Sequence, residues 1–218
     1  MSSTFEDVNP FPYIFRSSYD FQFDNIKDKI VKHLKEADNY AKSKGLTSLE
    51  KGGGVTSALI TNVKPRVSED PPHTWDEFKD FMTDWLPSMG ANIWEMFDYD
   101  PLVPRAVNGS WINVHGKGAY TDTHHHHGIA LAMVCYLKVP ENSGRLLIRN
   151  PMEIYTHAGP MKREYIDTKL MWRPIEVSTN DVIFFPGYLE HKTEINNTED
   201  NRYIMSLNVK AYPGGMIS

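Results

Sequence analysis

Near its middle the chain reads His124-His125-His126-His127-Gly128, followed at once by the apolar run Ile129-Ala130-Leu131-Ala132-Met133-Val134-Cys135-Tyr136-Leu137. An apolar run of this length predicts a buried β-strand, with the histidines just before its start. Side chains alternate across an extended chain, which places His124 and His126 on one face. An H-x-H pair joined by a third histidine from a later strand suits a divalent transition metal, because neutral imidazole binds iron, copper, nickel and zinc.

Two other interpretations of the histidine run are open. Four histidines can be a purification tag or a solvated loop, and single histidines are more often structural than ligating. Tags sit at chain ends, whereas this run lies mid-chain and joins the apolar strand through one glycine. The position favours a metal site.

The composition is that of a soluble globular protein of 218 residues, with 40% apolar and 23% charged residues. The formal net charge of −5 gives no nucleic-acid signature. Cys135 is the single cysteine, which excludes an intrachain disulfide and favours a reducing compartment. No signal-peptide pattern and no window of membrane-span length is present, so we expect a cytoplasmic protein without a membrane partner.

From Ser110 onward, short apolar or alternating runs are separated by turn residues at fairly regular intervals. This regular spacing of short strands and turns predicts a mainly β fold, namely a double-stranded β-helix, or jelly roll. We expect residues 1–110 to form an extended segment and supporting α-helices, and residues 111–212 the jelly-roll core of a single functional domain. The predicted strands are residues 111–115, 129–139, 145–149, 170–177, 181–185 and 202–212.

The N-terminal third shows two helical patterns. Residues 9–23 are aromatic and proline-containing and predict an extended segment, after which Asp24 is the expected N-cap of an amphipathic helix over 25–44. Residues 52–54 are three glycines without the Gly-Lys-Ser/Thr ending of a nucleotide loop, which predicts a simple turn.

Thr74 and Glu77 have the spacing of a capping box, which predicts the start of a second helix. We expect Pro87 to end it. Its broad apolar stripe is typical of a face that braces a sheet. That stripe consists of Phe78, Phe81, Met82, Trp85 and Leu86.

A second group of polar residues lies near the C-terminus. His191 follows a strand that breaks at Pro186-Gly187, and Arg202 opens a strand on which it shares a face with Ser206. A guanidinium aimed into a barrel needs an anion to meet it, and its planar fork matches a carboxylate. In isolation, His191 could equally cap a turn, and Arg202 could be a surface cation of little consequence.

The order of these features resembles the Fe(II)- and 2-oxoglutarate-dependent oxygenases. The order is H-x-H, a Tyr-Leu strand, Ser-Gly-x-Leu, Pro-Gly-x-x-x-His and Arg-x-x-x-Ser, covering residues 111–212. More narrowly, the chain resembles a group of small, mostly uncharacterised bacterial and phage oxygenases, and the wider pattern is similar to prolyl hydroxylases. The resemblance implies Fe(II) and 2-oxoglutarate as cofactors, O2 as oxidant and hydroxylation as the reaction.

The resemblance also implies roles for individual residues. His124, His126 and His191 match the iron ligands, and Arg202 matches the residue that binds the distal carboxylate of 2-oxoglutarate; these four are the expected catalytic set. The remaining cofactor-binding positions are Tyr136 and Ser206, which assist the arginine, Leu146, which lines the cosubstrate, and Asn113, which reaches its other end.

His126 departs from the superfamily pattern, because most members have a carboxylate there. We favour a three-histidine centre. Two alternatives are that Asp122 replaces His126 as a ligand, and that the site holds zinc or nickel without oxidation. Rival functions are a non-catalytic, cupin-like metal-binding barrel and a three-histidine dioxygenase that uses no 2-oxoglutarate; affinity for 2-oxoglutarate that depends on Arg202 would distinguish them from our prediction.

The substrate is not apparent from the sequence, and we expect either a small molecule or a protein side chain. Residues 153–173 are the expected lid, although their composition suits many partners. The oligomeric state is left open. The remaining histidines are expected to lie behind the ligands, to face the substrate or to be solvated; they are His115, His125, His127 and His157.

Overall fold

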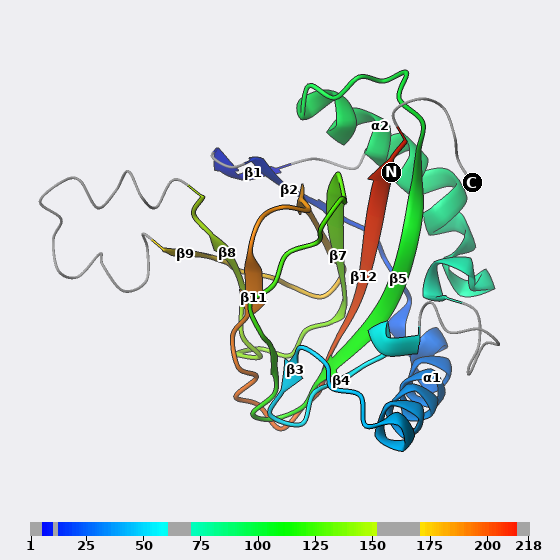
Figure 1. The fold of residues 1–218 in the computed structure, drawn as a ribbon, viewed down its shortest axis with the longest axis vertical. Helices are drawn as coiled ribbons and strands as arrows, with labels where there is room; N and C mark the ends of the chain where they lie inside the picture. Colours follow the sequence, from blue (N-terminus) through cyan, green and yellow to red (C-terminus); the bar gives the residue numbers. More distant parts are fainter. Residues whose placement is uncertain (1–5, 11–12, 61–70, 152–170, 213–218) are drawn as a thin grey trace, which may run out of the picture.

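The computed structural model describes residues 6–10, 13–60, 71–151 and 171–212, in which a large antiparallel sheet faces a smaller one (Figure 1). The order of the large sheet is β1 (Glu6–Pro10), β2 (Tyr13–Ser18), β10 (Asp181–Pro186), β7 (Leu131–Lys138), β12 (Arg202–Ala211), β5 (Arg105–His115) and β4 (Val55–Thr56). The smaller sheet contains β11 (His191–Thr193), β8 (Leu146–Arg149) and β9 (Trp172–Ile175). The predicted jelly roll is therefore confirmed.

Strict alternation along the central strands builds two separate cores. On β12, Tyr203, Met205 and Leu207 belong to one apolar cluster, whereas Ile204 belongs to the other. β7 and β10 divide their side chains in the same way. The first core packs under the helices and the second fills the space between the two sheets. Burial on both faces explains why β7 and β10 read as continuous apolar runs rather than as alternating ones.

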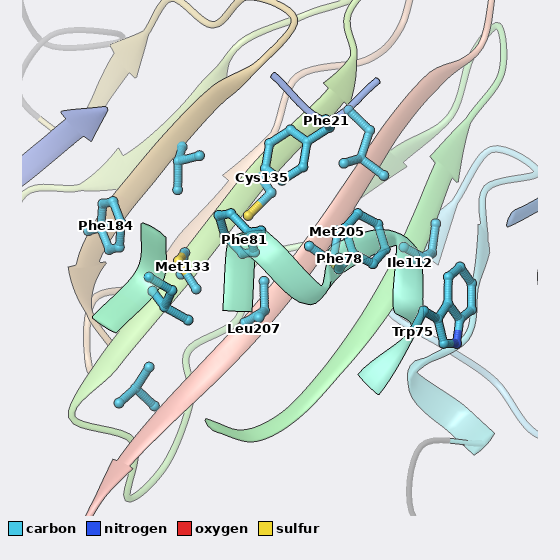
Figure 2. Packing of buried hydrophobic residues seen from close by; sticks show 14 of the residues in the cluster. Phe21, Trp75, Phe78, Phe81, Ile112, Met133, Cys135, Phe184, Met205 and Leu207 are labelled. Carbon is cyan, nitrogen blue, oxygen red and sulfur yellow. The ribbon is translucent and has the colours of Figure 1, made fainter. Parts of the chain in front are cut away.

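Helices cover the outer face of the large sheet. α1 (Phe23–Lys44) and α2 (Leu86–Met96) contribute buried residues to the first core. Figure 2 shows Phe78 and Phe81, from the turns before α2, against Met133, Cys135 and Met205 of the sheet. The prediction that this apolar stripe packs against the sheet is thus confirmed. No helix among the described residues is long and apolar enough to cross a membrane.

Three local predictions about the helices are wrong. The N-cap of α1 is Gln22, whose backbone is in the left-handed conformation, and not Asp24. The helix begins at Phe23, so Asp24 lies within its first turn. Thr74 is no capping-box acceptor: its Oγ1 donates to the carbonyl of Pro71 at 2.8 Å and closes the 3₁₀ turn η2 (Pro72–Thr74).

Pro87, in turn, does not end a helix but lies in the first turn of α2. Residues 76–78 form the 3₁₀ turn η3 (Asp76–Phe78), and the π-helical turn η4 (Phe81–Trp85) directly precedes α2. Proline has no N–H to donate and its ring crowds the preceding turn, so the wider π turn lets the helical backbone continue past it.

The segment of residues 50–56 closes the barrel mouth. β3 (Glu50–Lys51) pairs with β6 (Tyr120–Thr121), and β4 pairs with the end of β5. The turn predicted from the glycines is confirmed, since Gly52 and Gly53 have positive φ angles. The next turn, η1 (Ala58–Ile60), continues along the same edge. An N-terminal segment therefore reaches the interior of the jelly roll.

Replacement of Gly52 by alanine tests the close contact between this segment and the backbone of Gly118. Gly45 and Gly52 both have φ near +62°, but a Cβ on Gly52 would lie 2.0 Å from the carbonyl oxygen of Gly118, whereas one on Gly45 would meet nothing within 4 Å. Gly45→Ala should cost about 1 to 2 kcal/mol of unfolding free energy through backbone strain. Gly52→Ala should cost about 3 kcal/mol, because overpacking adds to the strain. Equal urea midpoints for the two variants would contradict the docked geometry.

Candidate metal centre and adjoining cavity

Three histidines from two distant segments meet at one end of the barrel. His124 and His191 exchange backbone hydrogen bonds of 3.0 and 2.9 Å, and the N–H of His126 donates to the carbonyl of Gly187 at 2.8 Å. A Cβ on Gly187 would lie 2.5 Å from the carbonyl oxygen of Ile129, so only glycine permits this approach. The turn at Pro186-Gly187 thus brings the two histidine segments together.

The ring nitrogens of these histidines converge. One nitrogen from each of His124, His126 and His191 lies within 4.8 Å of the others. Nδ1 of His124 donates to the carbonyl of Asp122 at 2.8 Å, and Nδ1 of His191 donates to that of Leu189 at 2.9 Å. Nδ1 of His126 donates to Oδ1 of Asn208. Because a carbonyl oxygen only accepts, each ring carries its proton on Nδ1 and presents the lone pair of Nε2.

The histidine cluster is held in the neutral form that a metal requires. The pKa of His126 is lowered to about 4, mainly by burial and in smaller part by the neighbouring His124 and His125. Burial also lowers the pKa of His124, and that of His191 well below its ordinary value. Neutral imidazole nitrogens are suitable ligands for iron, nickel and zinc. The donor set therefore fits a divalent transition metal.

The other histidines lie elsewhere, as does Asp122. The carboxylate of Asp122 accepts the N–H of Thr123 at 2.8 Å, and Asp122 is not part of the histidine cluster. His125 and His127 contact each other on the surface, 3.3 Å apart. His157 and most of the predicted lid over 153–173 lie outside the described residues.

A cavity of about 450 Å³ opens next to the histidine cluster. All three histidines line it, together with four of the predicted cofactor-binding residues, Asn113, Tyr136, Leu146 and Ser206. The N-terminal segment supplies another part of the wall, which the sequence did not predict. These wall residues are Thr47, Ser48, Leu49, Glu50, Lys51, Thr56, Ala58 and Leu59.

Arg202 is 0% exposed and is not among the residues that line this cavity. Its Nη1 donates to the carbonyls of Ser143 and Gly144, and its Nη2 donates to Nδ1 of His115 at 2.7 Å and to the carbonyl of Glu194 at 3.3 Å. The two Nη groups of the guanidinium, which we expected to bind a carboxylate, therefore already donate to acceptors within the protein. Nε is the remaining donor.

The buried donors that lack an acceptor within the described residues include Nε of Arg202 and the hydroxyl of Tyr136. The two groups are close enough for the guanidinium charge to oppose the rise that burial causes in the pKa of Tyr136. The phenol is therefore neutral and able to donate. Unsatisfied buried donors are costly, so an anion at this end of the cavity would remove a real penalty. The residues fit a carboxylate-bearing cosubstrate that extends from the metal centre to Tyr136.

Sequence reasoning missed several residues of the site. Glu50 lines the cavity, Asn208 fixes the ring of His126, and the Trp111 ring lies 5.7 Å from the His126 ring between centroids. Asn208 could have been found, because it shares the face of Arg202 and Ser206 on β12. No local pattern marks Glu50, which reaches the site only through pairing with Thr121.

Residues 109–208 match a family profile described as "Putative 2OG-Fe(II) oxygenase". This match confirms the superfamily that the sequence features resemble, and with it the Fe(II) and 2-oxoglutarate cofactors at the level of the family. No curated protein sequence matches the chain.

Solved structures are similar to this chain at low sequence identity. A prolyl-4-hydroxylase from Pseudomonas putida aligns at 10% identity with a TM-score of 0.50, covering 91% of this chain and 92% of that one. An oxidoreductase of the 2OG-Fe(II) oxygenase family from Burkholderia pseudomallei aligns at 12% identity and a TM-score of 0.46, covering 66% of this chain and 60% of that one. HygX from Streptomyces hygroscopicus, crystallised with nickel, 2-oxoglutarate and hygromycin B, aligns at 12% identity and a TM-score of 0.47, covering 81% of this chain and 78% of that one.

Paired alanine variants test the three-histidine centre. His126→Ala should weaken Fe(II) binding by about 100-fold or more, since even the partners behind metal ligands are worth about 10- to 100-fold. His125→Ala is the matched control, because that ring lies on the surface beside His127. Anaerobic competition against a chromogenic chelator measures both affinities. Equal Fe(II) affinity for the two variants would remove His126 from the ligand set.

Proposed function

Because residues 109–208 belong to the 2OG-Fe(II) oxygenase family, we propose that the protein is a 2-oxoglutarate-dependent dioxygenase that hydroxylates its substrate. The observation that carries the proposal is the cavity that joins three neutral imidazoles to the buried Tyr136 hydroxyl, which lacks an acceptor and lies near the Arg202 charge. One end of the cavity suits a metal, and the other end suits a carboxylate.

In the proposed reaction, one oxygen atom of O2 enters a substrate C–H bond and the other enters succinate. 2-Oxoglutarate supplies two electrons through the loss of its 1-carboxylate as CO2, and the substrate C–H bond supplies the other two. Bound iron supplies the redox chemistry that couples these changes. The protein's own contribution is to hold the metal on one face, to orient the cosubstrate and to keep water from the reacting atoms.

We assign the distal carboxylate of 2-oxoglutarate to the hydroxyl of Tyr136 and Nε of Arg202. Both donors are buried, so hydrogen bonds to a carboxylate there are stronger than in water. Leu146 and Ile204 supply apolar walls for the methylene groups, and Ser206 offers a further hydroxyl at the cavity surface. Asn113 accepts a 2.6 Å hydrogen bond from Thr56, which holds its amide at the cavity wall.

His124, His126 and His191 are the proposed iron ligands, each through Nε2. Three protein ligands would leave positions on a bound metal for a chelating 2-oxo acid and for O2. The ring of Trp111 beside His126 and that of Phe185, 4.7 Å from the His191 ring between centroids, limit access of water to two of the ligands.

The substrate is proposed to enter past the N-terminal wall of the cavity. Thr47, Ser48 and Lys51 line that wall together with Leu59. A mixed polar and apolar wall suits a small molecule or a protein side chain. Since residues 47–59 help to form the cavity, we propose that residues 1–110 and 111–212 act as one functional unit.

A dioxygenase that uses no 2-oxoglutarate is the second candidate. The observation that favours it is the occupied fork of Arg202, which leaves one guanidinium N–H for a cosubstrate. The two candidates differ in whether succinate is formed.

Tyr136→Phe tests whether the hydroxyl serves the binding of 2-oxoglutarate rather than the stability of the fold. Removal of a buried hydroxyl without an acceptor should leave the stability unchanged or slightly higher. The same change should raise the KM for 2-oxoglutarate about tenfold, because the carboxylate loses a hydrogen bond in a buried site. The measurements are thermal unfolding and succinate formation with Fe(II) and O2, with the exposed Tyr188→Phe as control.

Wild-type protein that binds iron yet forms no succinate would contradict the proposed function. For the hydroxylase assignment, isotopically labelled O2 should place one label in succinate and one in the product. A product without label would indicate another oxidation of the same class.

A further inference from the structure

Glu50 is a carboxylate within the barrel that no motif of the jelly roll contributes. Its side chain is 3% exposed, and it accepts hydrogen bonds from Nε2 of His115 and from Oγ1 of Thr121, the latter at 3.0 Å. The register Glu50↔Thr121 fixes its position. A Cβ on Gly54 would lie 3.1 Å from Cβ and 3.3 Å from Oε2 of Glu50, so glycine there leaves space for the carboxylate.

Arg202 is a buried cation without a direct carboxylate partner among the described residues. Its acceptors are three backbone carbonyls and the imidazole of His115. The side chain of Glu194, the other acidic residue close by, is engaged by Arg145 at 2.6 and 2.8 Å. A buried charge without a counter-charge costs several kcal/mol. Glu50 is therefore the carboxylate that can compensate Arg202, and His115 lies between them.

The ring of His115 is suited to join these two groups. His115 and Arg202 are cross-strand partners on β5 and β12, which brings Nη2 within 2.7 Å of Nδ1. Burial lowers the pKa of His115, so the ring is neutral and carries one proton. A guanidinium only donates and an ionised carboxylate only accepts. The proton must therefore be on Nε2, facing Glu50, with the lone pair of Nδ1 facing Arg202.

We propose that Glu50 is a positioning residue for the cosubstrate. By holding the proton of His115 on Nε2, it makes Nδ1 an acceptor that anchors one edge of the Arg202 guanidinium. The anchored guanidinium keeps Nε, its remaining donor, near Tyr136, which lines the cavity. This inference rests on the proposed function, because the group being positioned is the one assigned to 2-oxoglutarate.

The charges of the site are consistent with this role. The positive charge of Arg202 and the negative charge of Glu50 cancel, and the three histidines of the cluster are neutral. A divalent metal then meets the two negative charges of 2-oxoglutarate without a carboxylate ligand. Glu50 thus provides, at the arginine end, the negative charge that a three-histidine centre lacks at the metal.

The sign of the change in 2-oxoglutarate affinity tests the proposal. If Glu50 acted by charge alone, both Glu50→Ala and Glu50→Gln would tighten the binding of an anion. A positioning role predicts that Glu50→Ala weakens binding about tenfold, whereas Glu50→Gln, whose Oε1 still accepts from His115, stays within about threefold of wild type. Calorimetric titration of the anaerobic Fe(II)-loaded protein with 2-oxoglutarate measures this, with iron content checked in each sample.

Glu199→Ala is the matched control, because it removes the same charge from a surface side chain that is 82% exposed. Unchanged or tighter 2-oxoglutarate binding in Glu50→Ala would overturn the inference and leave the proposed function intact. No 2-oxoglutarate binding in the iron-loaded wild type would instead overturn the proposed function.

A measurement on the wild-type protein covers the case in which Glu50→Ala does not fold. Nitrogen NMR of histidine-labelled, metal-free protein reports the tautomer of His115. The proposal requires a neutral ring with its proton on Nε2, and Glu50→Gln should preserve that tautomer. A proton on Nδ1, or a doubly protonated ring, in the wild type would overturn the role of Glu50.

Discussion

The burial of the Arg202 charge is the constraint on which the interior of this barrel depends. The guanidinium lies at the start of β12, where alternation directs it between the two sheets, and four of its N–H groups are satisfied by the protein. His115 is placed by the β5–β12 register, and Glu50 is placed by the pairing of β3 with β6. One buried cation therefore links the N-terminal segment to the jelly roll, and the cavity forms where these parts meet.

The metal end of the cavity depends on hydrogen bonds rather than on charge. Each imidazole of the histidine cluster is fixed by a carbonyl acceptor on Nδ1, so the three rings present the same nitrogen without a carboxylate among them. Two of these acceptors are backbone carbonyls within two residues of their histidine, which makes the tautomer a local property of the chain. The third, Asn208, connects the cluster to the strand that begins at Arg202. The two ends of the site thus share β12.

The sequence predicted the features that repeat or that lie close together along the chain. Continuous apolar runs marked β7 and β10, and the order of His124, His126 and His191 marked the cluster. Local capping rules failed at Thr74 and Pro87, because a π turn and tertiary packing overrode them. Glu50 could not be predicted, since its role arises from a pairing with Thr121 that has no sequence signature. The hydrogen bonds of the Arg202 guanidinium were also beyond prediction, because three of its four acceptors are backbone carbonyls whose positions only the fold determines.

We propose that three neutral histidines bind Fe(II) at one end of a cavity whose other end receives the distal carboxylate of 2-oxoglutarate. The decisive experiment is an anaerobic titration of the Fe(II)-loaded protein with 2-oxoglutarate, followed by visible absorption. We expect a charge-transfer band of the chelated 2-oxo acid that saturates at one equivalent per chain. Iron-loaded protein that develops no such band would contradict it.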